Sequence, residues 1–262
     1  MEIYGKINIG LLVTGKQDNL HTIKTLFHSI SLSDAFEFGG EGIELFDETG
    51  ELDKIRYTEA LKKIFSRFNI KGAKVIKRIP LGGGLGGGTA VFAACCKHLN
   101  LDLTDEEKYK LSCDLPFMLK GGFALAEGVG EKLEFMPPKK CYALLVKSGS
   151  VDTAKAYALS DGSPRAKDNL SDIAERFDTL DFDVPNDLYI PAVKLNGGVE
   201  RVYSALSGYG LPCFMTGSGA TIAVLSHDRE RLEKILFDCR KKIPENCFKK
   251  IVSFVENDKN AK

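Results

Sequence analysis

The sequence predicts an α+β fold, in which strands and helices do not alternate regularly. A strand-like run at residues 73–79 precedes a stretch in which six of seven residues, Gly82 to Gly88, are glycine, and a helix-like run follows at residues 90–99. Alternating apolar residues predict a strand at residues 1–13, and an apolar run predicts a buried strand at residues 141–146. The chain has 262 residues, which is enough for two modest domains.

The other elements follow from periodicity and from capping signals. An amphipathic helix is expected at residues 53–68, where apolar side chains such as Leu61 and Phe65 share one face. Thr104 and Glu107 have the spacing of a capping box, which predicts the start of another helix. Further strands are expected at residues 25–32 and 35–38 (on either side of a break at Ser33-Asp34), 43–46, 212–216, 221–225 and 248–254, further helices at 152–159, 187–195, 198–206 and 228–242, and a hairpin at 120–128. A boundary near residue 148 would give two domains, 1–148 and 149–262.

Composition excludes several classes of function. Lys+Arg and Asp+Glu both total 36, so nothing indicates a nucleic-acid surface. No apolar run approaches the roughly 20 residues that span a membrane, and the first residues do not resemble a signal segment, so we expect a cytoplasmic protein that binds neither membrane nor nucleic acid. The 7 cysteines form no CxxC pair and the 4 histidines lack metal-ligand spacing, so no metal site or disulfide is expected.

The glycine-rich stretch predicts a cradle for an anion, most often a phosphate. Glycine lets a ligand approach the backbone closely, and the start of a helix offers unpaired N–H groups with partial positive charge. The stretch is not a Walker A loop, because Gly88 is followed by Thr89 without a lysine, and it is not set in the βαβ unit of a dinucleotide site. The alternative is a flexible linker. The predicted nucleotide-binding residues are Pro80, Leu81, Gly82, Gly83, Gly84, Leu85, Gly86, Gly87, Gly88, Thr89 and Ala90.

Phosphoryl transfer also needs charge neutralisation and a group that orients or deprotonates the attacking hydroxyl. Lys6 on the first strand and Asp114 near the end of a helix are candidates for these roles. Pro116 disfavours helix at the preceding Leu115, so Asp114 is expected where a helix gives way to a turn. For each residue the alternative is an ordinary surface charge.

The order and spacing of these motifs resemble the GHMP kinases. The loop from Pro80 to Gly86 matches their Pro-x-Gly-x-Gly-Leu-Gly motif. Within that superfamily the chain is most similar to the kinases of 4-diphosphocytidyl-2-C-methyl-D-erythritol, over nearly its whole length. The matching segments are Lys6-Ile7-Asn8, His21 with Thr25-Leu26-Phe27, Gly82 to Gly88, Asp114-Leu115-Pro116-Phe117 with Gly121-Gly122 and Gly130-Glu131, Asn186-Asp187-Leu188, and Met215-Thr216-Gly217-Ser218-Gly219.

This resemblance implies a two-domain GHMP kinase fold, with an N-terminal domain like ribosomal protein S5 and a ferredoxin-like C-terminal domain. It implies transfer of the ATP γ-phosphoryl group to the 2-hydroxyl of the methylerythritol unit, in isoprenoid precursor biosynthesis, with ATP and Mg²⁺ as cofactors. Asp114 would be the base and Lys6 its charged partner. His21 and Asn8 would bind the substrate, His21 at the cytosine edge. The alternative for His21 is a surface histidine, and the protein is expected to be a monomer or homodimer.

Four positions depart from the family pattern. Thr89-Ala90-Val91 replaces a more polar segment, which affects metal positioning, and Asp53 stands where an asparagine is usual. Leu20 replaces the tyrosine before the histidine, and the facing aromatic is expected near Leu195-Asn196, where neither residue has a ring. Two alternatives therefore stay open, namely a GHMP kinase with another hydroxyl acceptor and a non-catalytic nucleotide-binding paralogue.

Overall fold

The computed structural model describes residues 1–17 and 19–255. The strands are β1 (Glu2–Gln17), β2 (Leu20–Phe38), β3 (Gly42–Asp47), β4 (Gly72–Lys77), β5 (Phe123–Glu127), β6 (Lys132–Met136), β7 (Tyr142–Lys147), β8 (Cys213–Met215), β9 (Thr221–Ser226) and β10 (Phe248–Ser253). The helices are α1 (Lys54–Arg67), α2 (Ala90–His98), α3 (Asp105–Leu111), α4 (Leu115–Lys120), α5 (Thr153–Ser160), α6 (Leu170–Glu175), α7 (Tyr189–Leu195), α8 (Gly198–Leu206) and α9 (Arg229–Cys239), with short 3₁₀ turns at Phe177–Thr179 and Ser207–Tyr209. The mixed α+β class expected from the sequence is confirmed.

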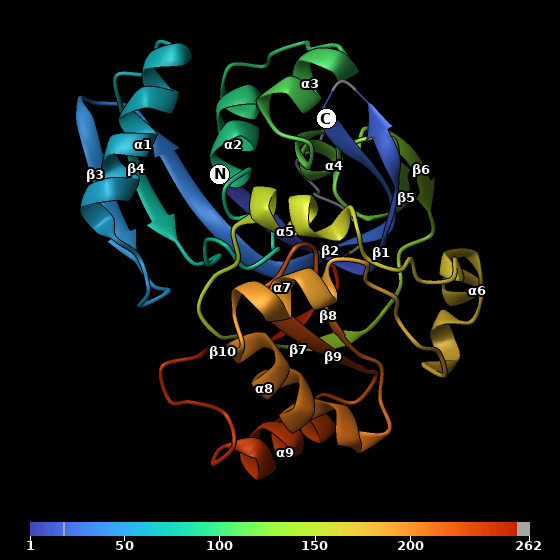
Figure 1. The fold of residues 1–262 in the computed structure, drawn as a ribbon. Coiled ribbons are helices and arrows are strands. Elements are labelled where there is room, and N and C mark those ends of the chain that lie inside the picture. The colour runs from blue at the N-terminus through green and yellow to red at the C-terminus, as the bar shows by residue number, and fades with distance from the viewer. Residues whose placement is uncertain (18, 256–262) are drawn as a thin grey trace.

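The first half of the chain forms a sheet around the long strand β2. Its order is β3-β4-β2-β5-β6, and β1 also pairs with β2 as an antiparallel hairpin. Helices α2 and α4 pack against β1, and α1 packs against β3 and α2 (Figure 1). This arrangement brings the start of β1, the loop before α2 and the start of α4 to one place.

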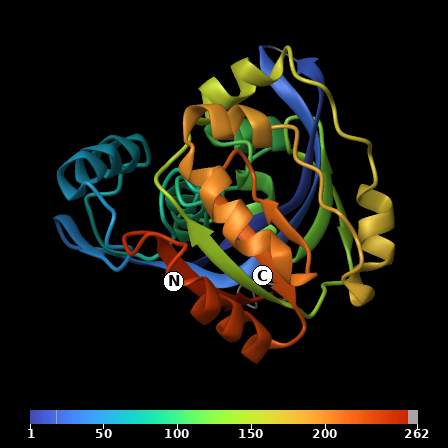
Figure 2. The ribbon, with the colours of Figure 1, turned by 60° about the horizontal axis from the view of Figure 1, so that its bottom comes forward.

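The second half forms a four-stranded sheet in the order β10-β7-β9-β8, with α8 and α9 packed against it (Figure 2). β7 precedes residue 148 in the chain but joins this second sheet. The division into domains at residue 148 therefore stays a prediction, and a division by sheets alone would fall before Tyr142. The two halves are joined through the hydrogen bonds from Val255 N to Ser29 O and from Asp187 N to Leu11 O, both between 2.9 and 3.1 Å.

Two local expectations are wrong. β2 runs without the predicted break at Ser33-Asp34. The Asp34 side chain is fully buried within it, where it accepts hydrogen bonds from Lys77 Nζ at 2.5 Å and from the backbone N of Arg78 and Ile79 at 2.7 and 2.8 Å. Asp114 lies in the turn that follows α3, as expected, but Leu115 is helical and begins α4, because Pro116 lies in the first turn, where a proline lacks no hydrogen bond that the helix needs.

His28 is a buried histidine on β2 that packs against the rings of Phe123 and Phe254. Its Nε2 accepts a hydrogen bond from the backbone N of Lys139 at 3.1 Å, so Nδ1 carries the proton and donates to Ser29 O at 2.9 Å. Burial lowers its pKa from 6.5 to about 4. The folded protein therefore contains a neutral histidine that the unfolded chain protonates more readily.

This linkage predicts a loss of stability in mild acid. Well above pH 6.5 both states hold His28 neutral, and the free energy of unfolding has its full value. As the pH falls from 6.5 toward 4, the unfolded state binds the extra proton, and we expect a loss of about 3 kcal/mol. The free energy of unfolding, measured with urea at several pH values in this range, should depend less steeply on pH in His28→Gln than in the parent. In His227→Gln, which changes an exposed histidine, the pH dependence should equal that of the parent. An unchanged slope in His28→Gln would contradict the assignment.

No helix in the described part of the chain is both long and apolar enough to cross a membrane.

Candidate active site

A cavity of about 720 Å³ lies where the two halves of the chain meet. It contains every nucleotide-binding residue predicted from sequence except Ala90, which is buried in the first turn of α2. It also contains Lys6, Asn8, His21 and Asp114, so residues that lie far apart in the sequence share one space. The second half of the chain lines it with Thr153, Ala154, Tyr157, Ala158, Asp161, Gly217 and Ser218.

Lys6 and Asp114 form an ion pair at this cavity. Lys6 Nζ lies 3.1 Å from Asp114 Oδ2, and the side chains are 4% and 30% exposed. Asp114 occupies the N-cap of α4 but makes no capping hydrogen bond, so its carboxylate is available to Lys6 and to a ligand. The interpretation of these residues as separate surface charges does not fit a lysine that is almost completely buried.

A short polar network fixes the direction of the Lys6 ammonium. Nζ donates to Asn8 Oδ1 at 2.7 Å, and Asn8 Nδ2 donates to Thr25 Oγ1 at 3.0 Å. Thr25 in turn donates to Gly10 O at 2.5 Å, while the backbone N of Asn8 donates to Thr216 Oγ1 at 2.7 Å. Asn8 was expected to bind substrate. Its side-chain oxygen and nitrogen are both used within the protein, and the side chain holds Lys6 in place. These uncharged groups hold the Lys6 ammonium in position but do not neutralise its positive charge.

The glycine loop lies against a second glycine turn from the other half of the chain. A Cβ at Gly84, where φ is +74°, would lie only 2.2 Å from Thr216 O. A Cβ at Gly83 would lie 2.9 Å from Thr221 Oγ1 and 3.0 Å from Lys147 Cδ. Gly84 therefore excludes any side chain, whereas a side chain at Gly83 would require Thr221 or Lys147 to shift, and the loop depends on close contact with residues 216–221.

The loop ends at Thr89, directly before α2. Thr89 is nearly buried and does not cap the helix with its side chain. Its hydroxyl instead lies 2.6 Å from the hydroxyl of Ser112, which also lines the cavity. The positive end of α2 is thus close to a pair of hydroxyls, a combination that suits a phosphate.

Substitution of Gly86 should weaken nucleotide binding. Its φ is +81°, and a Cβ there would lie 2.7 Å from Met118 Sδ. We expect Gly86→Val to raise the dissociation constant for ATP about tenfold, because left-handed strain of 1–2 kcal/mol would distort the loop. Titration with a fluorescent ATP analogue measures this change. The comparison is Gly88→Ala, because a Cβ at Gly88 has open space around it and φ is not left-handed there. This variant should have a dissociation constant for ATP closer to that of the parent. An unchanged titration for Gly86→Val would mean that the loop has only a structural role.

His21 also lines the cavity, beside the ring of Tyr157. The two rings are stacked with centroids 4.9 Å apart. His21 Nε2 lies 2.7 Å from Asp161 Oδ1, and the residue lies on the strand β2 with a side chain that is 13% exposed. Burial raises the pKa of the Tyr157 hydroxyl, and the Asp114 carboxylate raises it further.

Sequence reasoning missed Tyr157, although it lies on a helix that was predicted. The facing aromatic was sought at Leu195-Asn196, and neither of these lines the cavity. Asn196 instead donates to Ser148 O at 2.7 Å and accepts from Gly198 N at the start of α8. The expectation that this part of the cavity lacks a ring is therefore wrong. The available signal was an aromatic residue, Tyr157, inside the helix that was predicted after Ser148-Gly149-Ser150.

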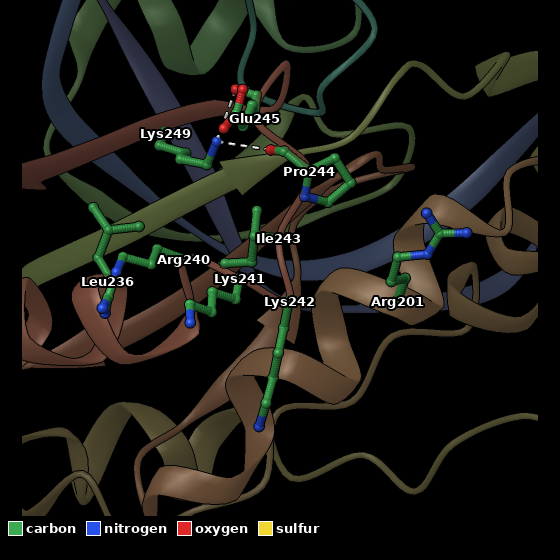
Figure 3. Close-up of a pocket in the computed structure, with 9 residues that line it drawn as sticks. All are labelled: Arg201, Leu236, Arg240, Lys241, Lys242, Ile243, Pro244, Glu245 and Lys249. Atoms are coloured by element: carbon green, nitrogen blue, oxygen red, sulfur yellow. Dashed lines mark hydrogen bonds between the residues drawn. The ribbon is translucent and has the colours of Figure 1, made fainter.

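A different cavity of about 800 Å³ lies at the end of α9, away from these residues. It is lined by Arg201, Leu236, Arg240, Lys241, Lys242, Ile243, Pro244, Glu245 and Lys249 (Figure 3). Figure 3 shows that its charged ends diverge instead of pointing at one place, and Lys249 is held by the carbonyl oxygens of Pro244 and Glu245. It contains no part of the glycine loop and no paired lysine and carboxylate.

Both halves of the chain match models of a known family. Residues 55–122 match the GHMP kinases N terminal domain, and residues 173–245 match the GHMP kinases C terminal domain. A 4-diphosphocytidyl-2-C-methyl-D-erythritol kinase of Thermoanaerobacter pseudethanolicus is 32% identical, over 92% of this chain and 91% of the relative. The chain belongs to the GHMP kinases. The kinase of the same name from Moorella thermoacetica is 33% identical, over 92% of this GHMP kinase and 95% of that relative.

A solved structure has a similar fold over 97% of this chain. It is a 4-(cytidine 5'-diphospho)-2C-methyl-D-erythritol kinase that is 26% identical to this GHMP kinase, with a TM-score of 0.73 and coverage of 97% of this chain and 99% of that one. The two-domain GHMP kinase fold expected from the sequence is therefore confirmed. Within residues 1–17 and 19–255, no group of three or more His, Cys, Asp or Glu side chains is placed to hold a metal ion.

Proposed function

We propose that this GHMP kinase transfers the γ-phosphoryl group of ATP to the 2-hydroxyl of 4-diphosphocytidyl-2-C-methyl-D-erythritol, in the synthesis of isoprenoid precursors. The observation that carries the proposal is the Lys6–Asp114 pair, 3.1 Å apart, in the same cavity as the glycine loop. Relatives of that name match the chain over about nine tenths of its length. Tyr157 and His21, which line the same cavity, offer a ring and a polar edge for a base.

The proposed chemistry follows from the roles of the two charged groups. Asp114 accepts the proton of the attacking hydroxyl and directs its oxygen toward the γ-phosphorus. Lys6 keeps this carboxylate ionised and offsets negative charge that develops as the phosphoryl group moves. The loop and the start of α2 hold the phosphates of ATP through backbone N–H groups.

Mg²⁺ is the proposed companion of ATP. It is usually held by substrate phosphates, by water and by one or two protein oxygens rather than by a protein cage. The Thr89 hydroxyl fits this need, since it lies at the end of the glycine loop and is not used to cap α2. Bound Mg²⁺ would neutralise phosphate charge and align the γ-phosphoryl group. Cytoplasmic location, and assembly as a monomer or homodimer, stay predictions.

The test is an ADP-release assay with ATP and a panel of hydroxyl acceptors, namely the cytidyl compound, mevalonate and homoserine. We expect turnover of the cytidyl compound alone, with the phosphate on its 2-hydroxyl by phosphorus NMR. Preference for another acceptor would favour the altered-acceptor kinase, and ATP binding without turnover of any acceptor would favour a non-catalytic paralogue.

A further inference from the structure

Two hydroxyl groups from different parts of the chain meet at the end of the glycine loop. Thr89 directly precedes α2, and Ser112 directly follows α3, two residues before Asp114. Because α4 packs against both α2 and α3 (Figure 1), Thr89 Oγ1 and Ser112 Oγ come within 2.6 Å of each other. At this distance the two hydroxyls are hydrogen-bonded and either can be the donor, and both residues line the cavity.

Neither hydroxyl is needed by the backbone around it. The Thr89 side chain is nearly buried but does not cap α2. The backbone of Ser112 is satisfied without its side chain, since its N donates to Lys108 O at 3.1 Å and its O accepts from Leu115 N at 2.9 Å. Over residues 1–17 and 19–255, each hydroxyl has the other as its one hydrogen-bond partner. The remaining bonding capacity of the pair is therefore open to a ligand in the cavity.

The bond between the two hydroxyls determines what they offer to such a ligand. A hydroxyl has one donor hydrogen and two acceptor lone pairs. The oxygen that donates within the pair has only lone pairs left for the cavity, whereas the oxygen that accepts still has its own hydrogen to donate. Whichever way the bond runs, the pair presents one oxygen that can only accept and one O–H group that can donate.

We propose that Ser112 is a further residue of the nucleotide site, which works with Thr89 to favour ATP bound to Mg²⁺ over metal-free ATP. This inference rests on the proposed function, because it assigns the two hydroxyls to the ATP and Mg²⁺ of that reaction. The phosphates of metal-free ATP carry only acceptor oxygens, so they can use the O–H group but not the accepting oxygen. ATP with Mg²⁺ presents a cation to the lone pairs as well as phosphate oxygens to the O–H group.

Ser112 allows the two tasks to be divided between two atoms. When Thr89 Oγ1 turns its lone pairs toward a cation, its hydrogen can lie in the bond to Ser112 Oγ, and Ser112 then donates its own hydrogen to a phosphate oxygen. Without the Ser112 hydroxyl, the single oxygen of Thr89 would have to serve both the cation and the phosphate. With metal-free ATP, Thr89 alone still supplies one O–H group, so little is lost.

The test measures how much Mg²⁺ tightens nucleotide binding in Ser112→Ala. A fluorescent ATP analogue is titrated into the full chain without acceptor, once with excess Mg²⁺ and once with EDTA, and the ratio of the two dissociation constants is compared with that of the parent. We expect this ratio to fall about tenfold, because a hydrogen bond to a charged group is lost. The dissociation constant in EDTA should stay nearly unchanged.

A double-mutant cycle tests whether the two hydroxyls act as a unit. Thr89→Ala should lower the Mg²⁺ ratio at least as much as Ser112→Ala, and the double variant should lower it little further, since each single change already breaks the pair. Ser112 has an extended backbone with φ of −167°, which alanine adopts without strain. Thermal unfolding of Ser112→Ala should therefore match that of the parent.

Thr14→Ala is the matched control. Thr14 Oγ1 also donates to another hydroxyl, Thr22 Oγ1 at 2.9 Å, but neither of these residues lines the cavity. This variant should keep the Mg²⁺ ratio of the parent.

Three results would overturn the inference, namely an unchanged ratio in Ser112→Ala, an equal loss of affinity with Mg²⁺ and with EDTA, or independent effects of Thr89→Ala and Ser112→Ala in the cycle. A parent protein whose affinity for the nucleotide does not depend on Mg²⁺ would overturn it as well. Because no acceptor is present, these titrations are separate from the proposed acceptor, which fails if the parent does not phosphorylate the cytidyl compound.

Discussion

Asp114→Asn is expected to lower kcat by about 10²- to 10⁴-fold and to leave ATP binding nearly unchanged. The amide has almost the shape of the carboxylate but cannot take the proton of the attacking hydroxyl. It also removes the charge that faces Lys6 Nζ at 3.1 Å. Because Asp114 makes no capping hydrogen bond, the substitution should not disturb the start of α4.

Steady-state kinetics and nucleotide titration together measure this prediction. The control is Asp105→Asn, which removes an exposed carboxylate from the first turn of α3 at a similar place in the chain. That variant should keep the parent kcat. More than about half of the parent activity in Asp114→Asn would show that another group accepts the proton.

Asp34→Ala is expected to destabilise the fold by about 3–5 kcal/mol, because it leaves a buried ammonium without its counter-ion. Asp34 and Lys77 are both completely buried, and burial is the main reason that the pKa of Lys77 is lowered. The same carboxylate satisfies the backbone N–H groups of Arg78 and Ile79, just before the glycine loop. Its loss therefore removes the partner of a charge and of two backbone donors.

Urea unfolding followed by circular dichroism measures the change in the free energy of unfolding. Glu59→Ala is the comparison, since Glu59 pairs with Lys62 on the exposed face of α1. Removal of that surface pair should cost no more than about 0.5 kcal/mol. A similarly small decrease in the free energy of unfolding in Asp34→Ala would mean that water or another group stabilises the charge of Lys77.

The elements that sequence predicted well have local causes. The capping box of Thr104 and Glu107 forms at α3 as expected, and the amphipathic pattern of residues 53–68 corresponds to α1, with Leu61 and Phe65 buried. These signals lie within one or two turns of the chain. Local sequence was therefore enough to predict them.

Two of the errors, at Asp34 and Tyr157, arose where the deciding partner is distant in sequence. Asp34 looked like a strand break because its partner Lys77 is 43 residues away. Lys6 and Asp114 were suggested by residue type and by resemblance, but their 3.1 Å contact depends on how β1 and α4 pack. Tyr157 was missed because only the fold places α5 beside His21. Local patterns carry no information on such pairings.

The contact between the glycine loop and residues 216–217 limits how far the two halves of this enzyme can be treated as interchangeable modules. Gly84 lies directly against Thr216 and Gly217, and the backbone N of Ala220 donates to Gly82 O at 3.1 Å. The loop's shape thus belongs to both halves jointly. A chimaera that joins the first half to the second half of another kinase would recover a nucleotide site only if the incoming turn reproduces this backbone. To change the acceptor specificity, one should therefore substitute side chains within the cavity and leave the contact between the glycine loop and residues 216–220 unchanged.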